Sequence, residues 1–329
     1  MSIEPPDTCG LICGFLLPKE GPAIPIDWDA ATNPNCAFER PVWLHFNLAD
    51  KRVINWIESS ETLPEGVRDV LLDNDSHTRH EVSEDGLALV IGDLHHDFNG
   101  DPEGFGTLRL YITKNLCLTG RRHPLKTTDN LRGSLTSGLE LSSTTELLAT
   151  LIDELAETFR RVVKDLENEV DEAEDKILAG RVHEQGPELG RVRRLIARLR
   201  RHVNGGRSTM LQGLTLANRW AGKPDVAEVR QSVERLNGIA QDLELVQERA
   251  RLLQEEIAGR LNEATNGNLY LLSVMTTVLL PINLITGIFG MNTGGLPWAE
   301  HPSGFWWVIA LMAVGVVTSL QFLHRRRIL

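Results

Sequence analysis

One stretch near the end of the chain limits what it can fold into. Residues 269–289, with the sequence LYLLSVMTTVLLPINLITGIF, contain no charged side chain. As an α-helix that rises about 1.5 Å per residue, this stretch spans about 30 Å, the thickness of the hydrocarbon core of a bilayer. A second uncharged run, residues 304–323, follows after a short loop. The sequence therefore predicts two membrane-spanning helices behind a long soluble portion.

Residues that are mostly polar or small recur at every third or fourth position along the first predicted span and the turn before it, which places them on one stripe of a helix. We call this set the polar stripe, and it consists of Asn266, Leu269, Ser273, Thr276, Leu280, Asn283, Gly287 and Gly290. Unpaired hydrogen-bonding groups are costly in lipid, so the stripe must face protein or water. Two interpretations are open: a packing seam, which small residues also suit, or a wet lining, which requires several copies of the chain around one axis.

Composition and charge exclude several classes of protein. The 329 residues carry a net charge of −11, which argues against a nucleic-acid partner. A mean hydropathy of −0.15 indicates that most of the chain is soluble. The four cysteines fit no paired metal-binding spacing, and we interpret them as reduced cytosolic thiols. The acidic N-terminus lacks the basic start of a signal peptide.

The distribution of lysine and arginine predicts the orientation in the membrane. Neither residue occurs between Arg260 and Arg325, whereas both flanks of the two spans are basic. By the positive-inside rule, both termini lie in the cytoplasm and the loop between the spans faces outward. Trp298, Trp306 and Trp307 occupy the outer boundary, where interfacial tryptophans are typical.

The first part of the chain has the pattern of an α/β domain. Five apolar runs with turn-rich borders predict strands at 10–17, 42–48, 87–94, 108–113 and 116–119, the last two joined by a tight turn at Lys114-Asn115. Asp50 and Pro64 are placed to begin helices. Four histidines (His77, His80, His95 and His96) lie near Asp93 and Asp97, but they lack a zinc-binding spacing and we interpret them as ordinary surface residues.

Long helices follow from Ser143, which with Ser142 and Glu146 has the pattern of a helix cap. The first ends near Gly180 and is acidic in its second half, and the second, from Pro187 to Trp220, begins with a run of arginines. This charge pattern favours either a salt-bridged hairpin, within or between subunits, or two solvated faces. A third helix begins at Asp225 and meets no proline until Pro281, so stalk and first span are predicted to be one helix. A soluble domain joined to the stripe in this way could act on a gate.

At the outer end of the first span, Gly290-Met291-Asn292 follows LLPINLITGIF, and TGGLPWAE comes next. In this position the sequence resembles the CorA-type metal-ion transporter family with its GMN motif. The loop after GMN is similar to that of the ZntB zinc-transporter branch and lacks the MPEL-like sequence usual in the magnesium branch. The resemblance covers the whole layout of the chain.

The resemblance implies an α+β membrane protein that forms a homopentamer in the bacterial inner membrane. It has a cytoplasmic α/β domain, a long helical hairpin, and a stalk helix that continues into two C-terminal transmembrane helices. We divide the chain into the α/β domain (1–142), hairpin (143–222), stalk (223–268), first transmembrane helix (269–290), periplasmic GMN loop (291–303), second transmembrane helix (304–324) and basic cytoplasmic tail (325–329).

Site residues follow from the resemblance and from the stripe together. The family's GMN loop implies an ion entrance formed by Gly290, Met291 and Asn292, and the acidic Glu300 lies in the same loop. The expected pore-lining residues are Asn266, Ser273, Thr276, Leu280, Asn283 and Gly287. Glu300 has an alternative role as a cap of the second span, since acidic residues are favourable at helix N-termini.

The expected cargo is Zn²⁺, driven by protons into the cell, and no cofactor or firmly assigned metal ligand is expected. The stripe offers amide and hydroxyl oxygens but no histidine, cysteine or carboxylate, so a hydrated ion fits better than a bare one. Alternatives are a channel for Mg²⁺, Co²⁺ or Ni²⁺, or zinc efflux. A signalling receptor would need a larger outer domain, and no nucleophile–base pair suggests an enzyme. Expected partners are other copies of the chain, membrane lipid and divalent cations.

Overall fold

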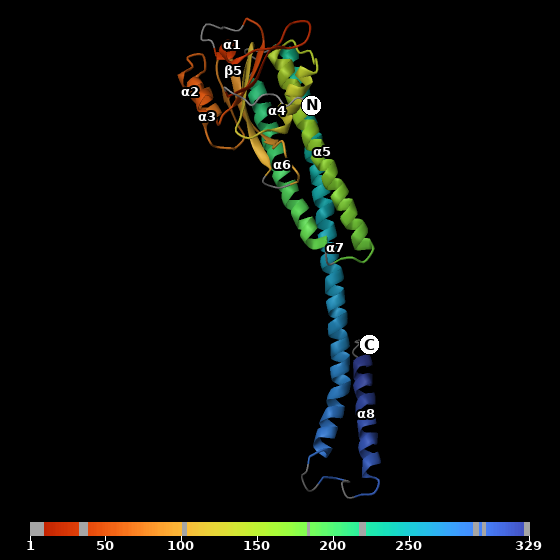
Figure 1. Ribbon diagram of the computed structural model, residues 1–329. Helices are drawn as coiled ribbons and strands as arrows, with labels where there is room; N and C mark the ends of the chain where they lie inside the picture. The colour runs from red at the N-terminus through yellow and green to blue at the C-terminus, as the bar shows by residue number, and fades with distance from the viewer. Residues whose placement is uncertain are drawn as a thin grey trace. The chain divides into compact units, whose positions relative to one another are not determined.

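The computed structural model describes residues 10–32, 39–100, 104–182, 185–216, 222–291, 296–297 and 301–325 (Figure 1). The chain divides into two compact units, Met1–Leu253 and Gln254–Leu329. One helix, α7 (Lys223–Phe289), runs through the boundary between them and has 67 residues. The prediction that stalk and first span form one helix is therefore confirmed.

The first unit contains a mixed seven-stranded sheet with the order β2-β1-β3-β7-β6-β5-β4. Among the strands that the structure describes, only β3 and β7 pair in parallel, and every other neighbouring pair is antiparallel. The strands are β1 (Leu11–Leu16), β2 (Ile24–Pro25), β3 (Val42–Asn47), β4 (Arg79–Val82), β5 (Gly86–Leu94), β6 (Phe105–Thr113) and β7 (Leu116–Arg121). The five predicted strands are confirmed, including the β6–β7 hairpin. The two edge strands were not predicted. Strand β2 has only two residues, and β4 has the mostly polar sequence RHEV, so neither forms an apolar run.

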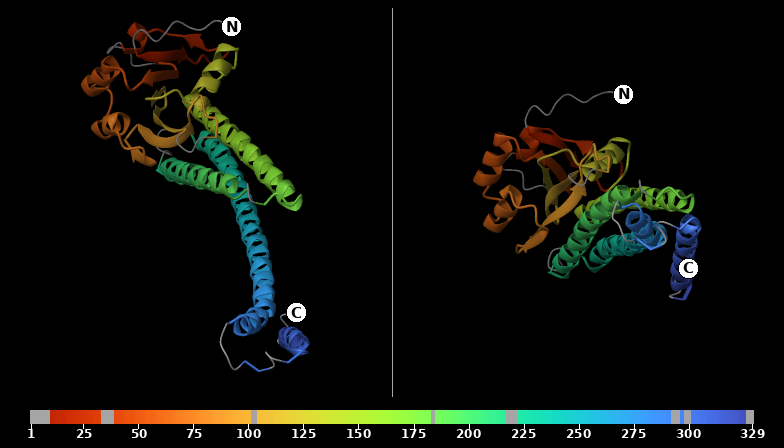
Figure 2. Two further views of the ribbon diagram at one scale, coloured as in Figure 1. Left: turned by 60° about the horizontal axis from the view of Figure 1, so that its bottom comes forward. Right: turned by 90° about the horizontal axis from the view of Figure 1, so that it is seen from below.

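Within the described residues, short helices accompany the sheet: α1 (Trp28–Thr32), α2 (Lys51–Ser59), α3 (Glu65–Leu72) and α4 (Lys126–Thr136). Asp50 caps α2 as predicted, since its carboxylate accepts a bond of 2.8 Å from the backbone nitrogen of Arg52. The α2 and α3 helices cover one face of the sheet (Figures 1 and 2), where buried side chains of both helices form one core with those of β3, β5 and β7. This burial is the main source of stability of the sheet domain.

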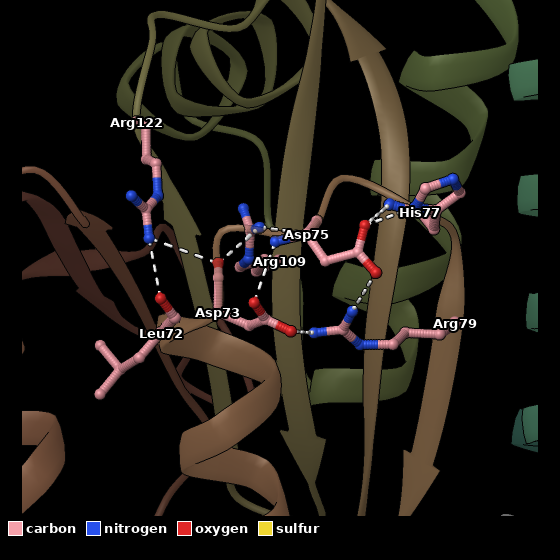
Figure 3. A network of polar contacts seen from close by, with 7 residues as sticks. All are labelled: Leu72, Asp73, Asp75, His77, Arg79, Arg109 and Arg122. Atoms are coloured by element: carbon pink, nitrogen blue, oxygen red, sulfur yellow. Dashed lines mark hydrogen bonds and ion pairs between the residues drawn. The ribbon is translucent and has the colours of Figure 1, made fainter.

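A network of arginines ties the end of α3 to the sheet (Figure 3). Arg109 lies within the apolar strand β6, and one of its terminal nitrogens donates to the carbonyl oxygens of Asp73 and Asp75, each at 2.8 Å. Arg122 donates to the carbonyl oxygen of Leu72 at 2.8 Å. The last carbonyls of a helix have no partner within the helix, so these bonds satisfy groups that would otherwise be unpaired. A charged residue inside an apolar strand is thus explained by a structural role.

Long helices complete the first unit: α5 (Thr144–Leu178), α6 (Gln185–Leu216) and the beginning of α7. Ser143 caps α5 as predicted, because its hydroxyl accepts from the backbone nitrogen of Glu146 at 3.1 Å, and the Glu146 carboxylate accepts in return from that of Ser142 at 2.8 Å. After α5 the chain turns at Gly180, whose φ of +81° is readily adopted only by glycine.

Ion pairs join the three long helices within one chain. Arg191 of α6 pairs with Glu169 of α5, as the hairpin prediction requires. The stalk also takes part: Arg249 of α7 lies 2.6 Å from Asp171 and 2.8 Å from Glu174 of α5. Such half-exposed pairs contribute about 0–1 kcal/mol each, so they select the arrangement of the helices more than they stabilise it.

The second unit contains the end of α7 and α8 (Gly304–Arg325). Both helices are long and apolar enough to cross a membrane, by length and composition. The predicted mixed fold with two apolar C-terminal helices is therefore confirmed.

Candidate functional site

The candidate site is the face of α7 that carries the polar stripe in the second unit. All pore-lining residues expected from the sequence are exposed in the single chain: Asn266, Ser273, Thr276, Leu280, Asn283 and Gly287. Leu280 has 63% of its surface exposed. Because α7 is a regular helix here, these side chains share one face, and no part of the described chain covers that face.

The opposite face of α7 packs against α8. The half-buried residues of this segment are Val274, Thr277, Val278, Pro281, Ile282, Ile285 and Phe289. A Cβ atom placed on Gly315 of α8 would lie 3.5 Å from Cβ of Pro281 and 3.9 Å from Cδ1 of Ile285. The contact with α8 thus lies on the side of α7 away from the polar stripe, and the stripe is uncovered together with apolar residues such as Met275 and Leu279.

Hydroxyl groups on α7 donate to the helix itself. Thr276 donates to the carbonyl oxygen of Leu272 at 2.8 Å, and Thr286 donates to that of Ile282 at 2.9 Å. Since the proton of each hydroxyl is used within the helix, the oxygen of Thr276 presents only acceptor lone pairs to the uncovered face. Acceptors suit the water shell of a cation, whose hydrogen atoms point outward from the ion.

The C-terminal end of α7 turns tightly at the expected ion entrance. The backbone nitrogen of Gly290 donates to the carbonyl oxygen of Thr286 at 2.8 Å. A Cβ atom at position 290 would lie 2.8 Å from that same oxygen, which is too close for a side chain. Met291 follows with 51% of its surface exposed. Asn292 and Glu300, the other expected entrance residues, lie outside the described residues.

Electrostatics at the site come from dipoles, because residues 269–291 contain no ionisable side chain other than that of Tyr270. The oxygen atoms available to a cation or its water shell are those of backbone carbonyls, of the Asn283 amide and of the Ser273 and Thr276 hydroxyls. These are hard ligands of the kind that suit a hydrated divalent cation. They could not hold a bare zinc ion in its usual tetrahedral shell of nitrogen and sulfur ligands.

In the soluble unit, the histidines do not assemble into a metal centre. Within the described residues, no group of three or more His, Cys, Asp or Glu side chains could hold a metal ion. His96 pairs instead with Asp129 at 3.0 Å. Strand β5 ends at Leu94, so His95 and His96 lie beyond it, and His95 forms an isolated bridge with Leu125.

Sequence reasoning named Asp93 but did not assign its buried role, and it did not find the contact at Gly315. The Asp93 carboxylate is buried at the N-terminus of α4, where it accepts a bond of 2.7 Å from the Thr127 hydroxyl and one of 3.2 Å from its backbone nitrogen. The signal was an acidic residue at the end of an apolar strand. Gly315 gives no such signal, because its contact with Pro281 depends on how α7 and α8 pack.

Comparison with known proteins identifies a family. The sequence model described as "CorA-like Mg2+ transporter protein" matches residues 38–325. A divalent cation transporter, CmaX of Pseudomonas aeruginosa, is 27% identical over 99% of this chain and 98% of its own length. A zinc transport protein, ZntB of Pectobacterium carotovorum, is 25% identical over 96% of this chain and 95% of its own.

Solved structures agree with this result. The full-length CmaX structure is 25% identical and covers 98% of this chain and 100% of its own, with a TM-score of 0.82. The complete structure of the CorA magnesium transporter from Methanocaldococcus jannaschii, 21% identical, covers 95% of this chain and 98% of its own, with a TM-score of 0.76, and shares the fold.

Proposed function

The chain belongs to the CorA-like Mg²⁺ transporter protein family, and from this premise we propose that it is a homopentamer that moves hydrated Zn²⁺ across the inner membrane. The coarser function, a divalent cation transporter of the CorA family, follows from the family and from relatives that cover nearly the whole chain. The number of subunits, the ion and the direction are the parts we propose.

The observation that carries the proposal is the uncovered polar stripe. Lipid is a poor solvent for the amide of Asn283 and the oxygen of Thr276, and α8 contacts α7 on another side, at Pro281 and Ile285. Copies of α7 arranged around one axis would turn these groups toward a shared aqueous lumen. A ring of this kind excludes lipid from the stripe and gives each cation oxygen atoms from every copy.

The chemistry of the stripe favours a cation that keeps its water shell. With no carboxylate, histidine or thiolate along residues 269–291, nothing compensates the ion for losing its water. Ring diameter and oriented acceptor oxygens would then select the ion. At the outer end, Gly290, Met291 and the Asn292 amide would meet the hydrated cation first. Asn266 lies at the opposite end of the stripe.

Zinc is proposed because of the TGGLPWAE loop and the relatives named zinc transport proteins. Relatives named for other or unspecified divalent cations support the alternative, a Mg²⁺, Co²⁺ or Ni²⁺ channel.

For the direction of transport we propose proton-driven uptake, with efflux as the alternative, and we propose that both termini are cytoplasmic. Zinc flux into proteoliposomes at two imposed pH gradients decides direction: uptake should rise when the zinc-donating side is more acidic, and a flux indifferent to the gradient would exclude proton coupling.

Asn283→Leu tests the proposed lumen. The substitution replaces an acceptor oxygen on the uncovered face with a similar volume of hydrocarbon, so zinc flux should fall at least about tenfold, as expected when an aqueous constriction becomes apolar and dewets. The matched control is Ile285→Leu, which changes shape but not polarity on the face that packs against α8. Native mass measurement should give five copies of 36.7 kDa for both variants.

Two outcomes contradict the proposal. If Asn283→Leu and Ile285→Leu reduce flux equally in intact pentamers, the stripe is a packing seam. If a monomer or dimer transports zinc at the rate of the wild type, no central lumen is needed.

A further inference from the structure

Pro281 interrupts the hydrogen-bond ladder of α7 within the membrane segment. Proline has no N–H group, so the carbonyl oxygen of Thr277, four residues earlier, receives no helix bond from position 281. The hydroxyl of Thr277 does not replace it, because that hydroxyl donates to the carbonyl oxygen of Ser273 at 2.7 Å. Helices bend most readily at such positions. The part of α7 beyond Pro281 carries Asn283 and Gly287.

The α8 helix touches α7 at this break. With only 3.5 Å between Cβ of Pro281 and the position of a Cβ on Gly315, the proline ring lies against the bare backbone of α8. Ile285, one turn further along α7, flanks the same glycine at 3.9 Å. Thr318 donates to the carbonyl oxygens of Val314 at 2.8 Å and Gly315 at 3.0 Å, so its hydroxyl bonds to the α8 backbone at the contact.

The contact and the stripe lie on opposite sides of α7. Successive helix residues are turned by about 100°, so Asn283 points about 200° away from Pro281. Pressure from α8 on Pro281 therefore moves Asn283 away from α8, in the direction that its uncovered face points. Because the ladder is broken at this position, the segment that carries Asn283 and Gly287 can respond without moving the remainder of the helix.

We propose that Gly315 is a positioning residue for transport: the α8 backbone at Gly315 braces α7 at its proline break and sets how far Asn283 and Gly287 project into the lumen. This inference rests on the proposed function, and it assigns to the second transmembrane helix a part in setting the width of the pathway. Gly315 itself contacts no ion.

The test is a graded series at position 315, assayed as zinc flux into proteoliposomes. Gly315→Ala adds one carbon at ordinary contact distance and should transport within about twofold of the wild type. Gly315→Val adds two further carbons that meet Pro281 and Ile285, and its maximal flux should fall about fivefold or more, as overpacking a close contact shifts the positions of the helices. The zinc concentration for half-maximal flux should not change, because the entrance is untouched.

Two further variants separate positioning from general damage. Gly315→Val combined with Ile285→Ala adds and removes three carbons at the same contact, and it should recover most of the lost flux. Ala313→Leu adds three carbons on the exposed side of α8 and should leave flux unchanged. All variants should retain the oligomeric mass of the wild type.

The possible failures are distinguishable. Wild-type protein without divalent-cation flux removes the proposed function and this inference with it. If the wild type transports and Gly315→Val transports equally well, the inference alone is overturned. The same follows if Ala313→Leu lowers the flux as much as Gly315→Val does. A loss in Gly315→Val that Ile285→Ala does not relieve, or that raises the half-maximal zinc concentration in proportion, also overturns it.

Discussion

Asp93 is a carboxylate buried beneath the first turn of α4. Burial raises its pKa from the ordinary value of 3.8 to about 6, although bonds from Thr127 and from the backbone of Leu94 lower it and Asp129 raises it further. A raised pKa in the folded state means that protonation favours folding. The stabilisation from Asp93 is complete below the unfolded pKa of about 4 and is lost as pH rises through about 6.

Asp93→Asn should therefore flatten the pH dependence of stability. Between about pH 7.5 and about pH 5, the wild-type folding equilibrium should gain a factor of about ten, or about 1.4 kcal/mol, that the variant does not gain. Thermal unfolding of the full-length protein in detergent, followed by circular dichroism, measures the difference. Asp85→Asn, at an exposed carboxylate, is the control. If Asp93→Asn and wild type show parallel pH profiles, Asp93 does not titrate as its burial requires.

At the scale of elements, α6 packs closely against the sheet, and one of the close contacts is at Gly92 of β5. His202 of α6 stacks on Phe105 of β6, with ring centroids 4.6 Å apart and an angle of 9° between the planes. Burial, and after it the neighbouring Arg201 and Arg198, lower the pKa of His202 to about 4, so the stacked ring is neutral at physiological pH. A Cβ atom on Gly92 of β5 would lie 2.1 Å from Nδ1 of this ring.

Gly92→Ala should displace His202 and destabilise the fold by about 1–3 kcal/mol, the usual effect of overpacking. Gly238→Ala is the matched control: it lies within α7, a Cβ there meets nothing within 4 Å, and removing a helical glycine should stabilise by about 1 kcal/mol or less. Chemical denaturation of the two variants measures both effects. In the double variant Gly92→Ala with His202→Ala, the penalties should not add, and simple additivity would show that the methyl group and the ring do not compete.

Elements with a strong periodic signal could be predicted from the sequence, and elements that depend on tertiary partners could not. The apolar run of β5 and the Ser143 cap of α5 are local features, and both were correct. The α4 helix, with the sequence KTTDNLRGSLT, has too few apolar residues to be predicted from periodicity. Polar contacts, such as that of Asp93 with Thr127, help attach it to the sheet. The polar stripe was visible because its spacing alone defines a helix face, whereas the Gly315 contact joins residues 34 positions apart in sequence.

On the scale of the whole molecule, each residue would occur five times around the axis of the proposed pentamer. One amide at Asn283 becomes a ring of five, and one carboxylate at Glu300 becomes five carboxylates around one mouth. The loop that contains Glu300 has no lysine or arginine, and His301 is its neighbour. Five negative charges around an opening raise the local concentration of dications, and they do so without choosing among elements of equal charge.

Glu300→Gln tests this attraction in the assembled protein. Fixed charges act over about 10 Å at 0.1 M salt and over less at higher salt, so the variant should need several-fold more zinc for half-maximal flux at low ionic strength. The difference should vanish as salt is added, while maximal flux and the preference among Zn²⁺, Co²⁺ and Ni²⁺ stay the same. The competing role is a cap of α8, whose first residue, Gly304, follows four positions later, and a cap would alter thermal stability instead. If Glu300→Gln and the wild type need the same zinc concentration for half-maximal flux at every salt concentration, Glu300 is assigned to the helix cap. Attraction at the entrance would then come from backbone oxygens alone.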